Sequence, residues 1–359
     1  MEVLWFLLTT GACNLACRYC GGSFKPAHSP WRPQVDAGDV AKFIAERDRS
    51  PVVFFYGGEP LLNPQYIEAV METMPQARFG VQTNGTLIRR LPPELWRRFS
   101  TVLLSIDGPP EVTDYYRGPG VYRKVVDALR WLKEEVGCGC KVVARMAVSR
   151  RSDIYRDVTH LLGLGFDAVH WQLNVIWTEE WGPREFLRWA EESYLPGVAR
   201  LRDHFIEEAE RGRVLGIIPF LGIYRALLVR PYDWVPCGAG KYAFAINTDG
   251  RILRCPIATA EKWANAGHVK IGLNGGTPRL KDKCFTCEYR HVCGGRCLYT
   301  HYEEYWGEEG FDAVCAVTKQ TIKTLEEAVP RLKQLLNAGV IKKENLDYDP
   351  LLDSTEVIP

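Results

Sequence analysis

The sequence has no excess of charge of one sign and no long hydrophobic run. Its 45 basic and 44 acidic side chains leave a formal net charge of +1, which does not favour a large nucleic-acid-binding surface or a polybasic membrane anchor. The apolar opening Met1–Leu8 is far too short to span a bilayer, and Glu2 stands where a secretory signal carries a basic residue. We therefore expect a cytoplasmic protein with no nucleic-acid or membrane partner.

Cysteine is the residue type that stands out. The chain has 359 residues, 46% hydrophobic and 25% charged, which is typical of a globular enzyme of about two domains or of a barrel with an appendage. Without an export signal its 12 cysteines are not expected to form disulfides, so their number indicates metal binding or catalysis. Three of them are Cys13, Cys17 and Cys20, two are Cys138 and Cys140, and the other seven lie between Cys237 and Cys315.

Short apolar runs alternate with amphipathic stretches through the first two-thirds of the chain. Apolar strands interleaved with helices indicate parallel βαβ units. Six units predict an α/β fold with a partial (β/α)6 barrel of the TIM type rather than a full eight-fold barrel. The predicted strands are Val3–Thr9, Val52–Tyr56, Phe79–Thr83, Val102–Ile106, Val142–Val148 and Ala168–Leu173, and the predicted helices are Asp36–Arg49, Pro64–Met74, Pro92–Phe99, Tyr122–Val136 and Asp153–Leu164.

The pattern changes after this region. A long charged helix is predicted over Arg184–Arg211, and Tyr242–Asn247 with Arg251–Arg254 predicts a β-hairpin that turns at Gly250. Cysteine-rich loops follow, and then a helix from about Thr318 to Asn337. We place a domain boundary near residues 215–235, which gives a barrel at 1–215, a small cysteine-rich α+β domain at 216–320, and a C-terminal helix and tail at 321–359.

The first cysteine group follows the first predicted strand directly. Cys13, Cys17 and Cys20 are separated by three and two residues, and they lie on the face that carries the chemistry in α/β barrels. Three thiolates can hold a [4Fe–4S] cluster and leave one iron without a protein ligand, open to a small molecule. The alternatives are three unrelated buried cysteines or a zinc site, although structural zinc usually takes four protein ligands.

This segment resembles the signature of the radical S-adenosylmethionine (SAM) superfamily, in which Tyr19, the aromatic residue before the third cysteine, also fits. In that family the open iron binds the amino and carboxylate groups of SAM, and one electron cleaves SAM to methionine and a 5′-deoxyadenosyl radical that abstracts hydrogen from the substrate. The resemblance therefore implies SAM, a [4Fe–4S] cluster, and an external electron donor of the flavodoxin or ferredoxin type.

Further motifs at predicted strand ends agree with this resemblance. Gly57-Gly58-Glu59 matches the motif that holds the methionine ammonium, although a Gly-Gly pair is also a plain turn. Ser105 and Arg117 match positions that contact the SAM ribose or carboxylate; the alternative for Arg117 is a surface ion pair. Other walls of the SAM pocket are expected at Thr83, Asn84, Gln172 and Leu173, where a common Asn-Gly turn and core packing are the alternatives.

The pattern of the C-terminal cysteines resembles a SPASM domain. This domain is a C-terminal extension of radical SAM enzymes that modify peptides, and it carries two further [4Fe–4S] clusters. Zinc ribbons, which have similar cysteine spacings, are the alternative. The resemblance implies one cluster on Cys284, Cys287, Cys293 and Cys315, and another on Cys237, Cys255 and Cys297. Several relatives have a fourth cysteine a few residues before the first of the latter group, but Pro231–Pro236 contains none. The second cluster would thus have an open iron or an oxygen ligand such as Asp233. Cys138 and Cys140 are expected to be structural thiols on the opposite face.

The resemblance implies hydrogen abstraction from a peptide, giving a crosslink (thioether or carbon–carbon) or an epimerised centre. In sulfatase-maturing members of the family, an acidic residue beside the second SPASM cysteine is the expected base. Cys255 has no acidic neighbour, so the resemblance disfavours formylglycine formation and identifies no catalytic acid or base. Several family members begin with a small domain that binds the leader peptide of the substrate. Because this chain begins at the first predicted strand, we expect that domain to be absent. The precursor would then be recognised by a separate protein, by the barrel itself, or not at all. The alternatives are a radical SAM enzyme acting on a folded protein or a small metabolite, and a non-enzymatic zinc protein.

Overall fold

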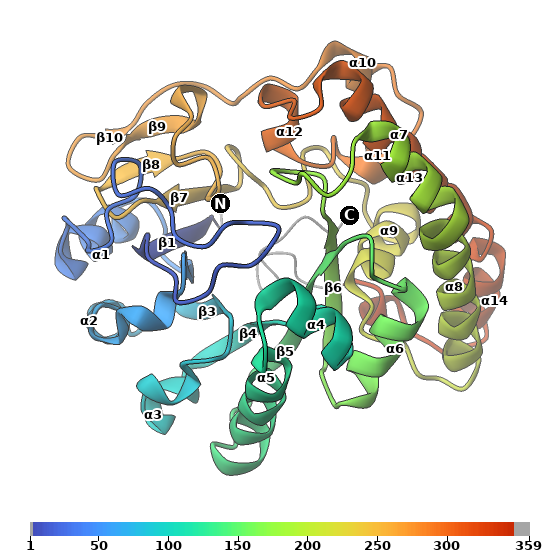
Figure 1. Ribbon diagram of the computed structural model, residues 1–359, viewed down its shortest axis with the longest axis horizontal. Helices are drawn as coiled ribbons and strands as arrows, with labels where there is room; N and C mark the ends of the chain where they lie inside the picture. Colours follow the sequence, from blue (N-terminus) through green and yellow to red (C-terminus); the bar gives the residue numbers. More distant parts are fainter. Residues whose placement is uncertain (1–2, 348–359) are drawn as a thin grey trace.

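The computed structural model describes residues 3–347, and a single curved sheet organises them (Figure 1). Its strand order is β10-β9-β8-β7-β1-β2-β3-β4-β5-β6. The strands are β1 (Leu4–Thr10), β2 (Val52–Gly57), β3 (Arg78–Thr83), β4 (Phe99–Ser105), β5 (Lys141–Val148), β6 (Ala168–Leu173), β7 (Ala243–Ile246), β8 (Arg251–Leu253), β9 (Asn265–His268) and β10 (Gly272–Leu273). Strands β1 to β6 are parallel and in chain order, which confirms the predicted partial barrel.

Helices cover the outer side of the parallel strands (Figure 1). They are α1 (Ala37–Ala45), α2 (Pro64–Thr73), α3 (Pro93–Trp96), α4 (Pro110–Arg117), α5 (Val121–Arg130), which continues as η3 (Trp131–Glu135), and α6 (Ile154–Gly163), with short 3-10 turns η1 (Pro60–Leu62) and η2 (Ile88–Arg90). The helix predicted at Pro92–Phe99 is shorter than expected, because Phe99 leaves it to pair with Phe79 as the first residue of β4.

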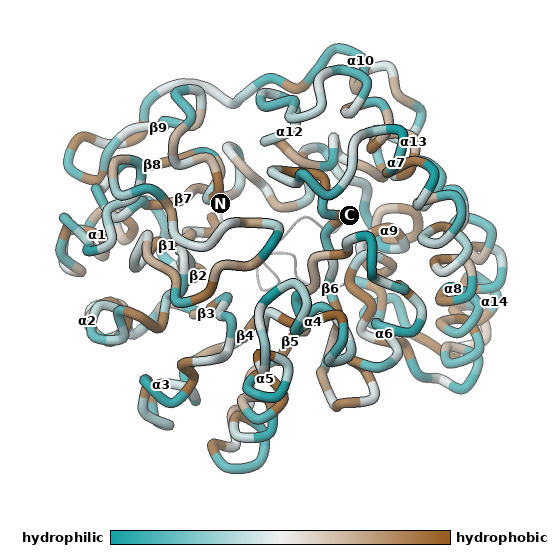
Figure 2. Tube along the Cα trace, in the orientation of Figure 1, coloured by the Kyte–Doolittle hydropathy of each residue, from teal (hydrophilic) through white to brown (hydrophobic). Residues whose placement is uncertain are grey.

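Local sequence explains where these helices begin and which face they bury. The Asp36 carboxylate accepts a hydrogen bond from the Asp39 N–H at the start of α1, and Asp153 does the same for the Arg156 N–H at the start of α6. In α5 the buried residues include Val121, Val125 and Leu129, spaced at one helical face. Hydrophobic and hydrophilic stretches alternate along the outer helices (Figure 2).

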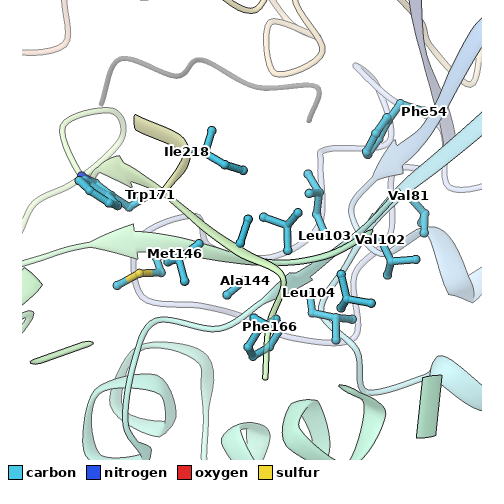
Figure 3. Close-up of a cluster of buried hydrophobic side chains, with 14 of the residues drawn as sticks. Phe54, Val81, Val102, Leu103, Leu104, Ala144, Met146, Phe166, Trp171 and Ile218 are labelled. Atoms are coloured by element: carbon cyan, nitrogen blue, oxygen red, sulfur yellow. The ribbon is translucent and has the colours of Figure 1, made fainter. Parts of the chain in front are cut away.

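The parallel strands are buried on both faces. Leu103 and Leu104 are adjacent in β4 and point to opposite sides, and neither is exposed (Figure 3). On one side Leu103 lies near Ile218 of α9 (Ile218–Leu228), and on the other Leu104 lies toward Phe166 and the outer helices. This double burial explains why the strands appear in the sequence as nearly continuous apolar runs.

The second part of the chain completes the sheet instead of forming a separate one. The predicted hairpin is present as β7 and β8, and β7 also pairs in parallel with β1, with Leu4 opposite Ala243. The sheet therefore runs across the predicted boundary at residues 215–235. The charged helical stretch is present as α7 (Pro183–Trp189), η4 (Ala190–Tyr194) and α8 (Leu195–Glu210).

The prediction of one continuous helix over Thr318–Asn337 is wrong. Helix α13 spans Gly307–Glu326, and a separate α14 spans Val329–Asn337. Pro330 lies in the first turn of α14, where its missing N–H costs nothing, whereas in a helix interior it would break a hydrogen bond. The remaining short elements are η5 (Lys262–Ala264), α10 (Asp282–Phe285), α11 (Arg290–Cys293), α12 (Leu298–Tyr302) and η6 (Lys343–Asn345). The rest of the expected tail, 348–359, lies outside the described residues.

One cysteine expectation is corrected. Cys138 and Cys140 form a disulfide, so they are not the free structural thiols expected. The single glycine between them leaves the two Cα atoms 5.2 Å apart, within the range that a disulfide bridges. Their expected position is right, since they directly precede β5 at the sheet edge opposite the first cysteine loop. Among the described helices, none is long and apolar enough to cross a membrane.

Candidate active site

The loop that carries Cys13, Cys17 and Cys20 is attached by its backbone to the ends of neighbouring elements. The Gly58 N–H donates to the Thr10 carbonyl at 3.0 Å, and the Glu59 N–H donates to the Ala12 carbonyl at 2.8 Å. Further along the loop, the Arg18 N–H donates to the carbonyl of Tyr116 in α4 at 2.9 Å. All three cysteines line one cavity of about 480 Å³ at the carboxyl ends of the parallel strands.

Gly57 and Gly58 allow this close attachment. A Cβ atom on Gly58 would lie 2.2 Å from the Ala12 carbonyl oxygen, and Gly57 has a φ of 138°, which side chains disfavour. The two glycines therefore allow the backbone after β2 to lie directly against the backbone of the cysteine loop. The pair is more than a plain turn, because it sets the position at which the loop leaves β1.

We expect Gly58→Ala to displace the cysteine loop, because the new methyl group would overlap the Ala12 carbonyl. Overpacking of this kind costs about 1–3 kcal/mol of unfolding free energy, and here it also separates thiols that must act together. Iron per chain after anaerobic reconstitution should fall, while Gly163→Ala is the control, since a Cβ atom on Gly163 meets nothing within 4 Å. Full iron content in Gly58→Ala would show that the loop tolerates the shift.

The thiols of the first group interact with one another. The Cys17 thiol hydrogen-bonds to the Cys20 sulfur, and this bond is the largest effect that lowers the pKa of Cys20 to about 6 and raises the pKa of Cys17. Burial raises the pKa of Cys13. Within residues 3–347, no three His, Cys, Asp or Glu side chains converge closely enough to hold a single metal ion. Three soft sulfur donors around one cavity are nevertheless the donor set that an iron–sulfur cluster takes, so the residues present fit that group.

Glu59 lies at the base of the same cavity and is almost fully buried. Its Oε1 accepts hydrogen bonds from the Thr83 hydroxyl at 2.7 Å and the Leu61 N–H at 3.0 Å, and its Oε2 accepts one from the Asn84 N–H at 2.7 Å. Burial raises the pKa of Glu59, and these three bonds oppose the rise. Glu59 therefore fixes the β3 end, and Oε2 keeps capacity for a further donor such as an ammonium group.

Arg117 is held by Asp107, which the sequence analysis did not select. Its Nε and Nη2 donate to the two Asp107 oxygens at 2.8 and 2.7 Å, and Asp107 is fully buried. The Tyr19 hydroxyl donates to Asp107 Oδ2 at 3.0 Å, and the Ala147 N–H donates to Oδ1 at 2.9 Å. The ion pair considered for Arg117 exists, but it is buried rather than on the surface, and it ties Tyr19 of the cysteine loop to β5.

Nearly all the residues expected to contact SAM surround the cavity of the first cysteine group. Those that line it are Tyr19, Gly57, Gly58, Glu59, Thr83, Asn84, Ser105, Arg117 and Gln172, whereas Leu173 lines the adjoining cavity. Sequence reasoning missed Gln82, Arg145, Trp177 and Glu261, which also line the large cavity. Gln82 and Arg145 carried a usable signal, because each is a polar residue inside an apolar strand. Trp177 and Glu261 are loop residues with no such signal.

The adjoining cavity, of about 250 Å³, brings the second cysteine group, which is Cys237, Cys255 and Cys297, to the first. Cys20, Cys237 and Cys255 all line it, and Cys297 packs in one buried cluster with Cys255. Asp233, the suggested oxygen ligand, is not among the residues that line it; its carboxylate accepts hydrogen bonds from Lys241 and Tyr242 at 2.7 and 2.6 Å. Partial burial favours a raised pKa at Asp233, but these two bonds outweigh it and lower the pKa.

The third cysteine group lines a small separate cavity. Cys284, Cys287, Cys293 and Cys315 surround a space of about 60 Å³ between α10, α11 and α13. Burial raises the pKa of Cys293 to about 12 and also raises the pKa of Cys284 and Cys315, whereas the nearby Arg296 guanidinium favours the thiolate of Cys293. Four thiols around one space make a closed donor set that fits an iron–sulfur cluster.

Comparison with known proteins agrees with this arrangement. Residues 7–148 match the sequence family described as the Radical SAM superfamily. The chain is 26% identical over 334 residues to mycofactocin maturase MftC of Mycobacterium tuberculosis strain H37Rv, covering 85% of this chain and 81% of the relative. It is also 26% identical over 336 residues to the AdoMet-dependent heme synthase of Oleidesulfovibrio alaskensis, covering 80% of each.

Among solved structures, that of native anSMEcpe with bound AdoMet is similar in fold. Its TM-score is 0.71 at 18% sequence identity, and the match covers 93% of this chain and 99% of that one. Streptococcus suis SuiB bound to the precursor peptide SuiA matches with a TM-score of 0.55 at 14% identity, covering 82% of this chain and 72% of SuiB. At these identities the likeness concerns the fold alone.

Proposed function

We propose that this chain, which belongs to the radical SAM superfamily, modifies a peptide by abstracting one of its hydrogen atoms. The family implies SAM and a [4Fe–4S] cluster, for which Cys13, Cys17 and Cys20 are the expected ligands. When bound, this pair would supply the 5′-deoxyadenosyl radical after one electron enters from an external donor of the flavodoxin or ferredoxin type. Glu59, Thr83, Asn84 and Arg117 would hold SAM against the cluster, and their hydrogen bonds to one another and to Asp107 would keep these side chains in position.

One observation carries the peptide assignment: Cys20 of the first group and Cys237 and Cys255 of the second line the same cavity. Crosslinking requires the substrate radical to lose one electron and one proton as the new bond forms. With the first group, the second and third cysteine groups would hold three clusters in all, and the cluster on the second group would provide an electron acceptor beside the substrate cavity. The incomplete group Cys237, Cys255 and Cys297 also leaves a position that a substrate cysteine thiolate can fill.

A tetrapyrrole substrate is the second candidate, because a relative named AdoMet-dependent heme synthase matches 80% of the chain, against 85% for the maturase. Both candidates use the same radical and differ only in what occupies the two adjoining cavities. A precursor recognised through a separate leader-binding protein fits the peptide assignment alone.

The test incubates anaerobically reconstituted protein with SAM, a reductant, and either a small peptide encoded beside its gene or iron coproporphyrin III. Mass spectrometry should show 5′-deoxyadenosine together with a peptide that has lost two hydrogen atoms, or that gains deuterium from D2O if a centre is epimerised. A modified tetrapyrrole with an unchanged peptide would replace the proposal by the second candidate. Failure to form 5′-deoxyadenosine with either would reject both.

A further inference from the structure

Trp177 stands at the junction of the two cavities. It lies on the loop after β6 and lines both the 480 Å³ cavity and the 250 Å³ cavity. The residue is 38% exposed. Within residues 3–347, Trp177 and Arg296 are the two non-glycine residues with positive φ, and Trp177 has a φ of 58°. A bulky residue adopts this conformation only where the surroundings enforce it.

The surroundings of Trp177 enforce this conformation. Its Nε1–H donates to the hydroxyl of Tyr299 in α12 at 3.0 Å, and the two rings meet edge to face at 5.6 Å. The Tyr299 hydroxyl in turn donates to Glu261 Oε1 at 3.3 Å. At the base of the loop, the Asn174 side chain donates to the Thr178 hydroxyl at 3.1 Å. The indole is thus fixed between the barrel and the cysteine-rich region. Its N–H edge is bonded to Tyr299, and the residue lines both cavities.

The walls around Trp177 in the smaller cavity are mainly apolar, with Phe6, Ile176, Pro256 and Ile257 among them. The two arginines that line this cavity are both engaged, since Arg254 donates to the carbonyls of Trp263 and Asn265 and Arg145 donates to the Met146 carbonyl at 3.2 Å. Glu261 is engaged by Tyr299. The space therefore favours an uncharged, apolar side chain, and its volume is that of a side chain rather than of a folded domain.

We propose that Trp177 is a specificity-determining residue that seats an apolar or aromatic side chain of the peptide substrate against its indole, between the first and second cysteine groups. This inference rests on the proposed function. The residue held against Trp177 selects which neighbouring C–H bond faces the radical, while Tyr299 and Glu261 fix the angle of the indole.

The test measures peptide binding to reconstituted, SAM-loaded protein by calorimetry. The probes are synthetic peptides with Gly-Ser repeats on both sides of one variable position, occupied by Phe, Leu, Ser or Asp. The wild type should bind the Phe and Leu probes about tenfold or more tightly than the other two, because only they bury apolar surface. Trp177→Asn, which suits positive φ but lacks the indole, should reduce this preference to about threefold or less. Trp177→Phe should keep the order.

Trp31→Asn is the matched control, since Trp31 is 51% exposed and is not among the residues that line either cavity. If Trp177→Asn fails to fold, Tyr299→Phe serves instead, because it removes the hydroxyl that holds the indole and should weaken the preference. An unchanged preference in these variants, or none in the wild type, would overturn the proposal. Release of 5′-deoxyadenosine, assayed separately, reports on the proposed function and does not depend on the binding result.

Discussion

Replacing Cys13, Cys17 and Cys20 together by Ala is expected to remove about four of about twelve iron atoms per chain and to abolish SAM cleavage. The three thiols line one cavity, and Cys17 and Cys20 already hydrogen-bond to each other, so no single sulfur acts alone. The remaining cysteine groups lie on other elements and should keep their iron. Iron analysis with a 5′-deoxyadenosine assay by chromatography measures both effects.

The matched control replaces Cys138 and Cys140 by Ala. These two cysteines form a disulfide with each other and lie at the opposite edge of the sheet, so iron content and SAM cleavage should stay at the wild-type level. If the triple variant still cleaved SAM fully, the first cysteine group would not be the site of that reaction. If the control lost iron, Cys138 and Cys140 would be ligands rather than a disulfide.

Asp107→Asn is expected to destabilise the protein by about 3–5 kcal/mol, because it leaves the Arg117 guanidinium charged and without its buried partner. Asp107 is fully buried and accepts hydrogen bonds from Arg117, Tyr19 and Ala147. Its loss should loosen the hold on Tyr19 and therefore also lower SAM affinity. Urea unfolding of the iron-free chain gives the stability, and equilibrium dialysis of the reconstituted protein gives the affinity.

Glu185→Gln is the comparison for Asp107→Asn. Glu185 pairs with Arg150 at 3.1 Å, but the two side chains are 57% and 49% exposed, so the pair should contribute no more than about 1 kcal/mol. Similar small losses in the two variants would mean that Arg117 finds another partner or reaches water. In that case the Asp107 cluster would not set the position of the cysteine loop.

Some parts of the fold depend on local sequence, and others depend on residues that are far apart in the chain. The six barrel strands were predictable because burial on both faces demands continuous apolar runs, which are a local property of the sequence. Gly57, Gly58 and Glu59 were also predictable as a motif. The structural reason for the glycine at position 58 was not predictable, because the backbone that approaches it belongs to Ala12, which is far away in the chain. The break between α13 and α14 was missed because the apolar pattern continues across Pro330.

The sequence alone predicted the resemblance to the radical SAM superfamily, the grouping of the cysteines and the six barrel strands, since each rests on residue type and spacing. Only the tertiary structure decided that Asp107 neutralises Arg117, that β7 joins β1, that Cys138 pairs with Cys140, and that Trp177 meets Tyr299, 122 residues away. Such pairs form because folding removes charged and polar groups from water, and each must then find whichever partner the packing brings near. That choice of partner depends on the arrangement of the whole chain, and no local pattern encodes it.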